Sequence, residues 1–98
     1  MIDQPKKILL VEDEPFVADL YCYHLEKAGF VVKIAKNGLE ALDLLKTDSY
    51  NLMLLDIMLP MLNGLVVLKK CKQEKLAPNL PIILLTTLAS DTTIKEGF

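Results

Sequence analysis

The sequence predicts an α/β domain in which parallel strands and helices alternate along the chain. Short apolar runs lie at residues 8–11, 30–35, 52–55 and 82–85, each bounded by turn-forming residues. The stretches between these runs carry apolar residues three and four positions apart, as amphipathic helices do. Because strand–helix–strand units join by right-handed crossovers, we predict a doubly wound parallel sheet with helices on both faces.

Length and composition indicate one globular domain over residues 1–98. The chain has 98 residues, 52% hydrophobic and 24% charged, which suffices for one core and not for two. Its net charge of -2 supplies no basic surface for nucleic acid or an anionic membrane. No signal-peptide core precedes the first strand, and no run approaches the roughly 18 apolar residues of a membrane span. Cys22 and Cys71 lack metal-ligand spacing, so we expect a reduced, cytoplasmic setting.

The first strand and helix have clear start and stop signals. The strand at residues 8–11 ends on Glu12 and Asp13, and Pro15 stands where proline favours the start of a helix. Gly29 is the expected left-handed stop of a helix over residues 16–28. The helical spacing predicts an inner face made of Val17, Leu20, Tyr21 and Leu25.

The second strand and helix are predicted at residues 30–35 and about 38–47. Lys33 within the strand indicates a position near an edge of the sheet. Asn37 is a suitable helix cap, and Glu40 three residues later resembles the second member of a capping box.

The third helix is predicted at residues 65–74, after a tight turn permitted by Gly64. Its spacing predicts an inner stripe made of Leu65, Leu68 and Cys71. The lysines of this segment are interpreted as a solvated outer face: Lys69, Lys70, Lys72 and Lys75. The last strand, residues 82–85, leads into Thr86.

Asp56 is the candidate functional residue, because it ends the third apolar run at the rim where open α/β sheets bind ligands. An aspartate in this place can also simply cap a turn. If the first and third strands are neighbours, however, Glu12, Asp13 and Asp56 share one pocket, since adjacent strands lie only about 4.8 Å apart. Such a cluster is costly without a cation, and oxygen ligands favour Mg²⁺.

Together these residues resemble the receiver domains of bacterial two-component response regulators. The resemblance rests on Glu12 and Asp13 after the first strand and on Asp56 within the segment DIMLPMLNG, which includes Met58, Pro60 and Gly64. It also rests on the segment PIILLTT, in which a buried strand ends on Thr86. These features occur in the family's order along the whole chain.

The resemblance implies a flavodoxin-like sheet of strand order 2-1-3-4, with Asp56 as the phosphoacceptor. Mg²⁺ would be held by Glu12, Asp13, Asp56 and the backbone carbonyl of Met58. Thr86 would contact the phosphoryl group and switch the loop after the fourth strand. The implied partner is a sensor histidine kinase or a phosphotransfer protein, and the chain would be a signalling domain rather than an enzyme, beyond catalysing its own phosphorylation and dephosphorylation.

The far end of the chain departs from the receiver pattern. Receivers normally continue into a fifth strand that carries a lysine and then into a final helix, and neither occurs in these 98 residues. The resemblance therefore implies an incomplete receiver domain with weakened or lost phosphoryl transfer and with its output domain elsewhere. We expect residues 82–85 to form an exposed apolar edge, through which the chain dimerises or swaps strands.

Other functional classes remain open at this point. An aspartate-nucleophile phosphatase usually has a second acid two residues after the first, where this chain has Met58. A flavin or nucleotide binder needs a glycine-rich or hydroxyl-rich loop after the first strand, where this chain has acidic residues. The third alternative is an interaction module that is never phosphorylated.

Overall fold

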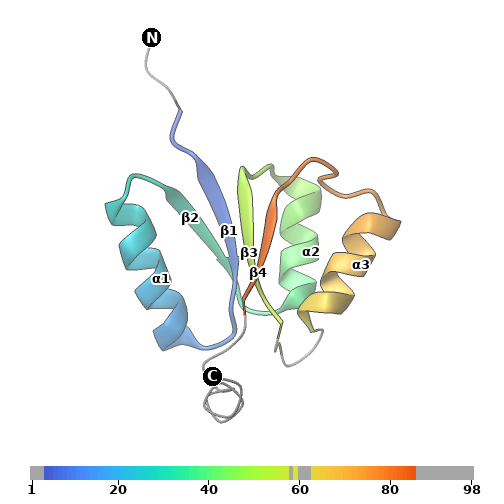
Figure 1. The fold of residues 1–98 in the computed structure, drawn as a ribbon, viewed down its shortest axis with the longest axis horizontal. Coiled ribbons are helices and arrows are strands. Elements are labelled where there is room, and N and C mark those ends of the chain that lie inside the picture. The colour runs from blue at the N-terminus through green and yellow to red at the C-terminus, as the bar shows by residue number, and fades with distance from the viewer. Residues whose placement is uncertain (1–3, 58, 60–62, 86–98) are drawn as a thin grey trace, which may run out of the picture.

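The computed structural model describes residues 4–57, 59 and 63–85 (Figure 1). Within them the elements are β1 (Lys7–Val11), α1 (Pro15–Lys27), β2 (Val31–Ala35), α2 (Gly38–Thr47), β3 (Leu52–Asp56), α3 (Gly64–Gln73) and β4 (Ile82–Leu85). The strands form one parallel sheet in the order β2-β1-β3-β4. The predicted fold class and strand order are therefore confirmed.

The central pairing joins β1 to β3 in a register that aligns their carboxyl ends. Leu10 is paired with Leu54 and Val11 with Leu55, so the residues that follow each strand emerge at the same rim. On the far side of β3, Asp56 is paired with Leu85 of β4. The acidic ends of β1 and β3 are therefore neighbours because of the backbone pairing alone.

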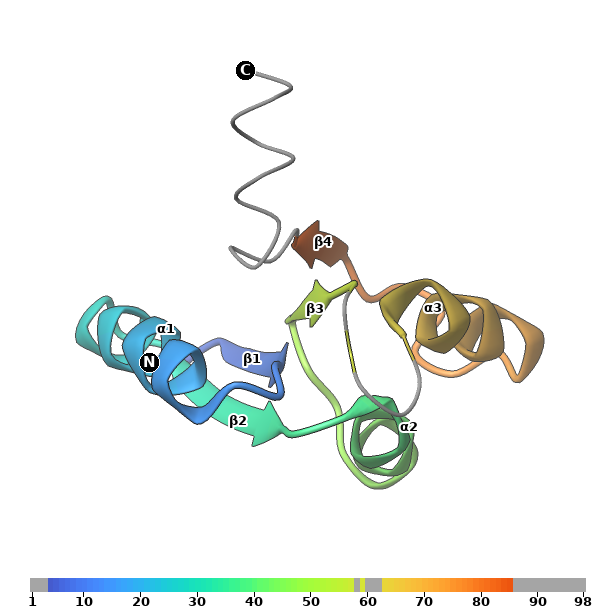
Figure 2. The same ribbon diagram turned by 90° about the horizontal axis from the view of Figure 1, so that it is seen from below.

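Alternate residues of the strands face two apolar clusters, one on each side of the sheet. Leu9, Val11, Met53 and Leu55 pack with α2 and α3, whereas Ile8, Leu10 and Leu54 pack with α1. Figure 2 shows α1 on one side of the sheet, with α2 and α3 on the other. Burial on both faces explains why β1 and β3 are continuous apolar runs instead of alternating ones.

The helix ends follow the predicted signals, with one change. Pro15 is the first residue of α1, and Gly29 has a φ of 100° beyond its end. The Asn37 side chain accepts a hydrogen bond of 2.9 Å from the Glu40 backbone N–H, as predicted. Glu40 Oε1, however, accepts from the N–H of Lys36 and not from that of Asn37, so the reciprocal bond reaches one residue further than in a capping box.

The predicted inner faces of α1 and α3 are partly wrong. Leu20 and Tyr21 of α1 are exposed, at 51% and 37%, and Ala18 is the residue of that helix buried against the sheet. Leu65 of α3 is likewise exposed, and Val67 is buried in its place beside Cys71. Both segments are amphipathic helices as predicted, but Ala18 and Val67, the residues buried against the sheet, each lie two positions from an exposed leucine.

β4 is the least covered strand of the sheet. Among the described residues it pairs with β3 alone, and Ile83 and Leu84 are 50% and 38% exposed. Its four residues are all apolar, so the strand has none of the charges that normally protect an edge. At the opposite end of the sheet, β2 carries Lys33 in an exposed position, as the sequence predicted.

Candidate functional site

Three carboxylates from the ends of β1 and β3 meet at the rim of the sheet. One oxygen from each of Glu12, Asp13 and Asp56 can be chosen so that all lie within 4.8 Å of one another. The β1–β3 register and the short stretch after Val11 produce this arrangement, since Asp56 is the last residue of its strand and the other two directly follow theirs.

The three groups differ in exposure and environment. Asp56 is 1% exposed and Glu12 is 7% exposed, whereas Asp13 is open to solvent. Burial raises the pKa of the Glu12 carboxyl to about 7, and the negative charges of Asp56 and Asp13 and a hydrogen bond with Asp56 act in the same direction. A hydrogen bond that Glu12 Oε2 accepts from the Glu14 backbone N–H, at 3.2 Å, partly opposes this shift. In the absence of a cation, Glu12 therefore holds its proton up to near neutral pH.

The donor set fits a hard cation. Carboxylate oxygens are the ligands that Mg²⁺ binds, and a buried pair with an exposed third member leaves room for the waters that Mg²⁺ retains. The surroundings that raise the pKa of Glu12 also favour cation binding. Burial and the neighbouring carboxylates disfavour the ionised form of Glu12, and a divalent cation would stabilise that form. The arrangement can thus hold a cation next to a buried carboxylate nucleophile.

Gly64 lies where the start of α3 meets the end of β3, and glycine is needed there for a different reason from the one predicted. Its N–H donates to the Ile57 carbonyl at 2.9 Å. A Cβ on Gly64 would lie 2.5 Å from the Asp56 carbonyl oxygen and 2.9 Å from the Ile57 Cα. Glycine is therefore required for close approach of two backbones, and not for the tight turn that the sequence suggested.

Two predicted site positions, the Met58 carbonyl and Thr86, lie outside the described residues, as does Pro60 of the connecting loop. The structure therefore brings together Glu12, Asp13 and Asp56, and it adds Gly64, which sequence reasoning placed in the loop without recognising its contact with Asp56. The only signal for that contact was a glycine at the start of a helix, which is too common to interpret.

Comparison with known proteins connects this geometry to one family. The family model described as "Response regulator receiver domain" matches residues 8–98. The transcriptional regulatory protein PhoP for alkaline phosphatase synthesis from Bacillus subtilis is 44% identical over 81 residues, which are 83% of this chain and 33% of PhoP. The chain spans 33% to 43% of the length of the first curated relatives that it matches.

Solved structures give the same result. The response regulator TrrA from Thermotoga maritima, in complex with Mg²⁺–BeF, has a TM-score of 0.76 and 38% identity, covering 83% of this chain and 69% of TrrA. A CheY-like receiver domain protein from Methanospirillum hungatei has a TM-score of 0.79 and 31% identity, covering 95% and 75% of the two chains. No helix in the described part of the chain is long and apolar enough to cross a membrane.

The substitution Gly64→Ala is expected to lower the free energy of unfolding by about 1–3 kcal/mol, because the new methyl group must displace the backbone of Asp56 or α3. Chemical denaturation measures this change. Gly29→Ala is the control, since a Cβ there meets nothing within 4 Å and costs only the left-handed conformation, about 1–2 kcal/mol. Amide NMR shifts near Asp56 should move in the first variant alone, and shifts of equal size there in both variants would contradict the role given to Gly64.

The raised pKa of Glu12 predicts a pH-dependent stability without metal. In the unfolded chain this carboxyl has its ordinary pKa of 4.5, whereas in the folded chain its pKa is raised to about 7. The folded state therefore binds more protons between these values, and the free energy of unfolding falls as pH rises through this window, by roughly 3 kcal/mol in all. Urea titrations with a chelator, from about pH 5 to about pH 8, measure the slope.

The control for this prediction is Glu12→Gln, which cannot titrate and should flatten the slope. Mg²⁺ should stabilise the wild-type chain more at the upper end of the pH range, because Glu12 must lose its proton to bind the ion. An unchanged slope in Glu12→Gln would show that other groups cause the pH dependence.

Proposed function

We propose, on the premise that this chain belongs to the response regulator receiver domain family, that Asp56 accepts a phosphoryl group from a phosphohistidine of a partner protein. One observation carries the proposal: Asp56 is 1% exposed at a strand end, and its carboxylate is grouped with those of Glu12 and Asp13. An aspartate that only caps a turn does not need two further acids beside it. The repulsion between the three carboxylates destabilises the fold, so the cluster is expected only where it has a function.

The chemistry assigned to Asp56 is a direct transfer. An oxygen of its carboxylate attacks phosphorus, the P–O bond forms as the P–N bond to the histidine breaks, and the imidazole keeps the electron pair and takes up a proton. The product is an aspartyl phosphate. Burial excludes water from the reacting carboxylate, and Gly64 keeps its backbone in place.

Glu12, Asp13 and Asp56 would hold Mg²⁺, together with the Met58 carbonyl, and the ion would supply positive charge against the transferring group. The Mg²⁺–BeF complex of TrrA, a protein 38% identical to this chain, supports this part of the proposal. Thr86, directly after β4, would contact the phosphoryl oxygens and couple phosphorylation to a movement of the chain that follows β4.

The partners follow from the same premise. The donor would be a sensor histidine kinase or a phosphotransfer protein in the cytoplasm. Because the curated relatives are transcriptional regulatory proteins and this chain matches about a third of PhoP, we propose that the 98 residues are the receiver domain of a longer regulator. Its output would be transcriptional, with DNA bound by a region outside these residues, whose net charge of -2 does not favour binding to nucleic acid.

Phosphorylation by a small donor such as acetyl phosphate tests the site. With Mg²⁺ present, the intact mass should rise by one phosphoryl group, and the rise should vanish on chelation of Mg²⁺ and in Asp56→Asn. Asp13→Asn should slow the reaction about tenfold or more by weakening the metal site. Asp43→Asn, at an exposed position of α2, is the matched control and should react normally. A phosphoryl group that still appears in Asp56→Asn would exclude Asp56 as the acceptor.

The exposed edge of β4 leads to a second proposal, that two copies of the chain associate through this strand. Ile83 and Leu84 are exposed on an uncharged strand, which is the condition for edge-to-edge pairing. Sedimentation should show a concentration-dependent dimer that Ile83→Lys abolishes. Val31→Lys on β2, where Lys33 already protects the edge, is the control and should leave the dimer intact. A monomer at all concentrations, or a dimer unaffected by Ile83→Lys, would contradict this interface.

A further inference from the structure

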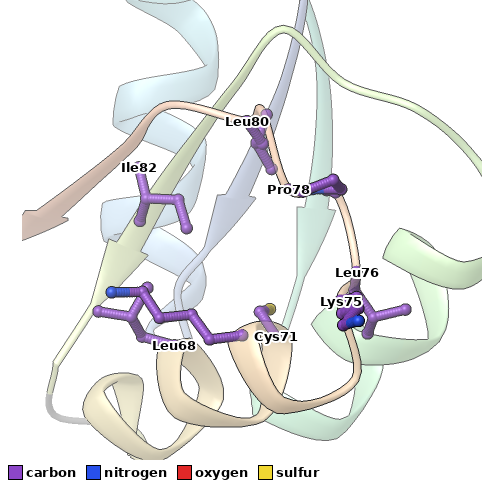
Figure 3. Close-up of a pocket in the computed structure, with 9 residues that line it drawn as sticks. Leu68, Cys71, Lys75, Leu76, Pro78, Leu80 and Ile82 are labelled. Atoms are coloured by element: carbon purple, nitrogen blue, oxygen red, sulfur yellow. The ribbon is translucent and has the colours of Figure 1, made fainter.

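A cavity of about 250 Å³ lies between α3 and the connection from α3 to β4, away from the acidic rim. Figure 3 shows Leu80 and Ile82 on one side of it and Leu68 and Cys71 on the other, with Leu76 at the end of the helix. The wall is predominantly apolar, and Leu68, Leu76, Leu80 and Ile82 also pack against the core cluster that contains Cys71. The cavity is therefore an open extension of the hydrophobic core.

Backbone hydrogen bonds fix the conformation of the chain that lines the cavity. The N–H of Leu76 donates to the Cys71 carbonyl at 2.9 Å, and that of Lys75 to the Lys72 carbonyl at 3.3 Å, which together close α3 as a Schellman motif. Lys75 and Ala77 have φ values of 55° and 43°, left-handed values that turn the chain away from the helix axis. A further bond from the Leu80 N–H to the Ala77 carbonyl, at 3.0 Å, fixes the opposite wall. The cavity is thus bounded by a segment whose conformation is fixed by its own hydrogen bonds.

The charge around the cavity is positive. Lys72 and Lys75 line it, and among the described residues the ion pairs are Lys7 with Asp48 and Lys46 with Glu74. Glu74, the acid between the two lysines in sequence, therefore has Lys46 of α2 as its partner, at 3.8 Å. The Cys71 thiol adds no charge of its own, because burial and, to a lesser extent, the negative charge of Glu74 raise its pKa. The lysines do offset the dipole of α3, but that role does not require an apolar cavity between them.

We propose that this cavity binds a small amphipathic carboxylate, with its alkyl or aryl part among Leu68, Leu80 and Ile82 and its carboxylate beside Lys72 and Lys75. An apolar cavity of about 150 Å³ in another protein holds benzene, so about 250 Å³ accommodates a longer or bulkier group. The anionic head selects against neutral and cationic analogues of the same length. Lys72 and Lys75, which the sequence analysis interpreted as part of a solvated outer face, would then bind the carboxylate of the ligand.

This site is separate from the acidic rim. Ile82 begins β4 and pairs with Met53, whereas Asp56 pairs with Leu85 at the other end of the same ladder. A ligand in the cavity therefore leaves the three carboxylates uncovered. Phosphorylation of Asp56 and binding in the cavity can accordingly be measured independently, and the failure of one proposal does not decide the other.

Octanoate is the first probe, titrated into the 98-residue chain and followed by methyl and amide NMR. Saturable shifts should be confined to residues that line the cavity, with a dissociation constant of about 1 mM. Octanol and octylamine have the same chain with a neutral and a cationic head. Octanol should bind roughly threefold to tenfold more weakly than octanoate, and octylamine more weakly still, with the difference shrinking at high salt.

Two charge variants make the test specific. The double variant Lys72→Gln, Lys75→Gln should reduce octanoate affinity to that of octanol, while octanol binding is unchanged. The double variant Lys33→Gln, Lys69→Gln removes the same charge from positions that do not line the cavity and should bind octanoate as the wild type does. Both pairs are at the surface, so folding is preserved and amide spectra verify it.

Three outcomes would overturn the proposal. The first is no saturable shift with octanoate. The second is equal affinity for the three head groups, which would remove the role of the lysines. The third is a set of shifts centred on the exposed apolar residues of α1, Phe16, Leu20 and Tyr23, which would mean nonspecific adsorption.

Discussion

The parallel pairing of β1 with β3 is the constraint on which the rest of this structure depends. Its register aligns Val11 with Leu55, so Glu12, Asp13 and Asp56 leave the sheet at one rim. The charges of the three acids do not bring them together, since all three are negative when ionised; the hydrogen bond between Glu12 and Asp56 depends on a proton shared within the pair. Backbone hydrogen bonds and the buried apolar side chains of the two strands stabilise the pairing, and the pairing fixes the positions of the carboxylates. The site is thus a place where packing holds like charges in proximity.

That proximity has an electrostatic cost, which the raised pKa of Glu12 lowers below neutral pH, where its carboxyl is protonated. Glu12 is largely buried, and burial is the largest cause of its raised pKa. Asp13 stays in solvent, where water screens its charge. The cores on both faces of the sheet offset the remaining cost, because β1 and β3 bury nearly every side chain they carry. A divalent cation would take over the role of the proton.

The sequence was sufficient for the order of elements, the parallel sheet and the three acids, because these depend on patterns with few alternatives. Continuous apolar runs identify buried strands, and Pro15, Gly29 and Asn37 mark helix ends whatever the tertiary context. The buried stripes of α1 and α3 could not be obtained in the same way. Leu20 and Leu65 are as apolar as core residues, but Ala18 and Val67 are the residues that are buried, and apolar spacing alone does not specify which side of a helix faces the sheet. The raised pKa of Glu12 likewise arises only when β1 and β3 pair. The contact of Gly64 with Asp56 and the cavity beside α3 depend on how α3 is placed against the strands, which periodicity does not specify.

The separation in sequence of the paired strands also bears on how fast the site assembles. β1 meets β2 through Lys7 and Val31, and it meets β3 through Ile8 and Leu52, a loop nearly twice as long. Closing the longer loop costs less than about 0.6 kcal/mol more, which is too little to delay one pairing behind the other. Charge differs more between the two steps, since only the second brings carboxylates together. We therefore expect the rate at which β1 and β3 join during folding to respond to ionic strength and to divalent cations, and hardly to the length of the intervening chain.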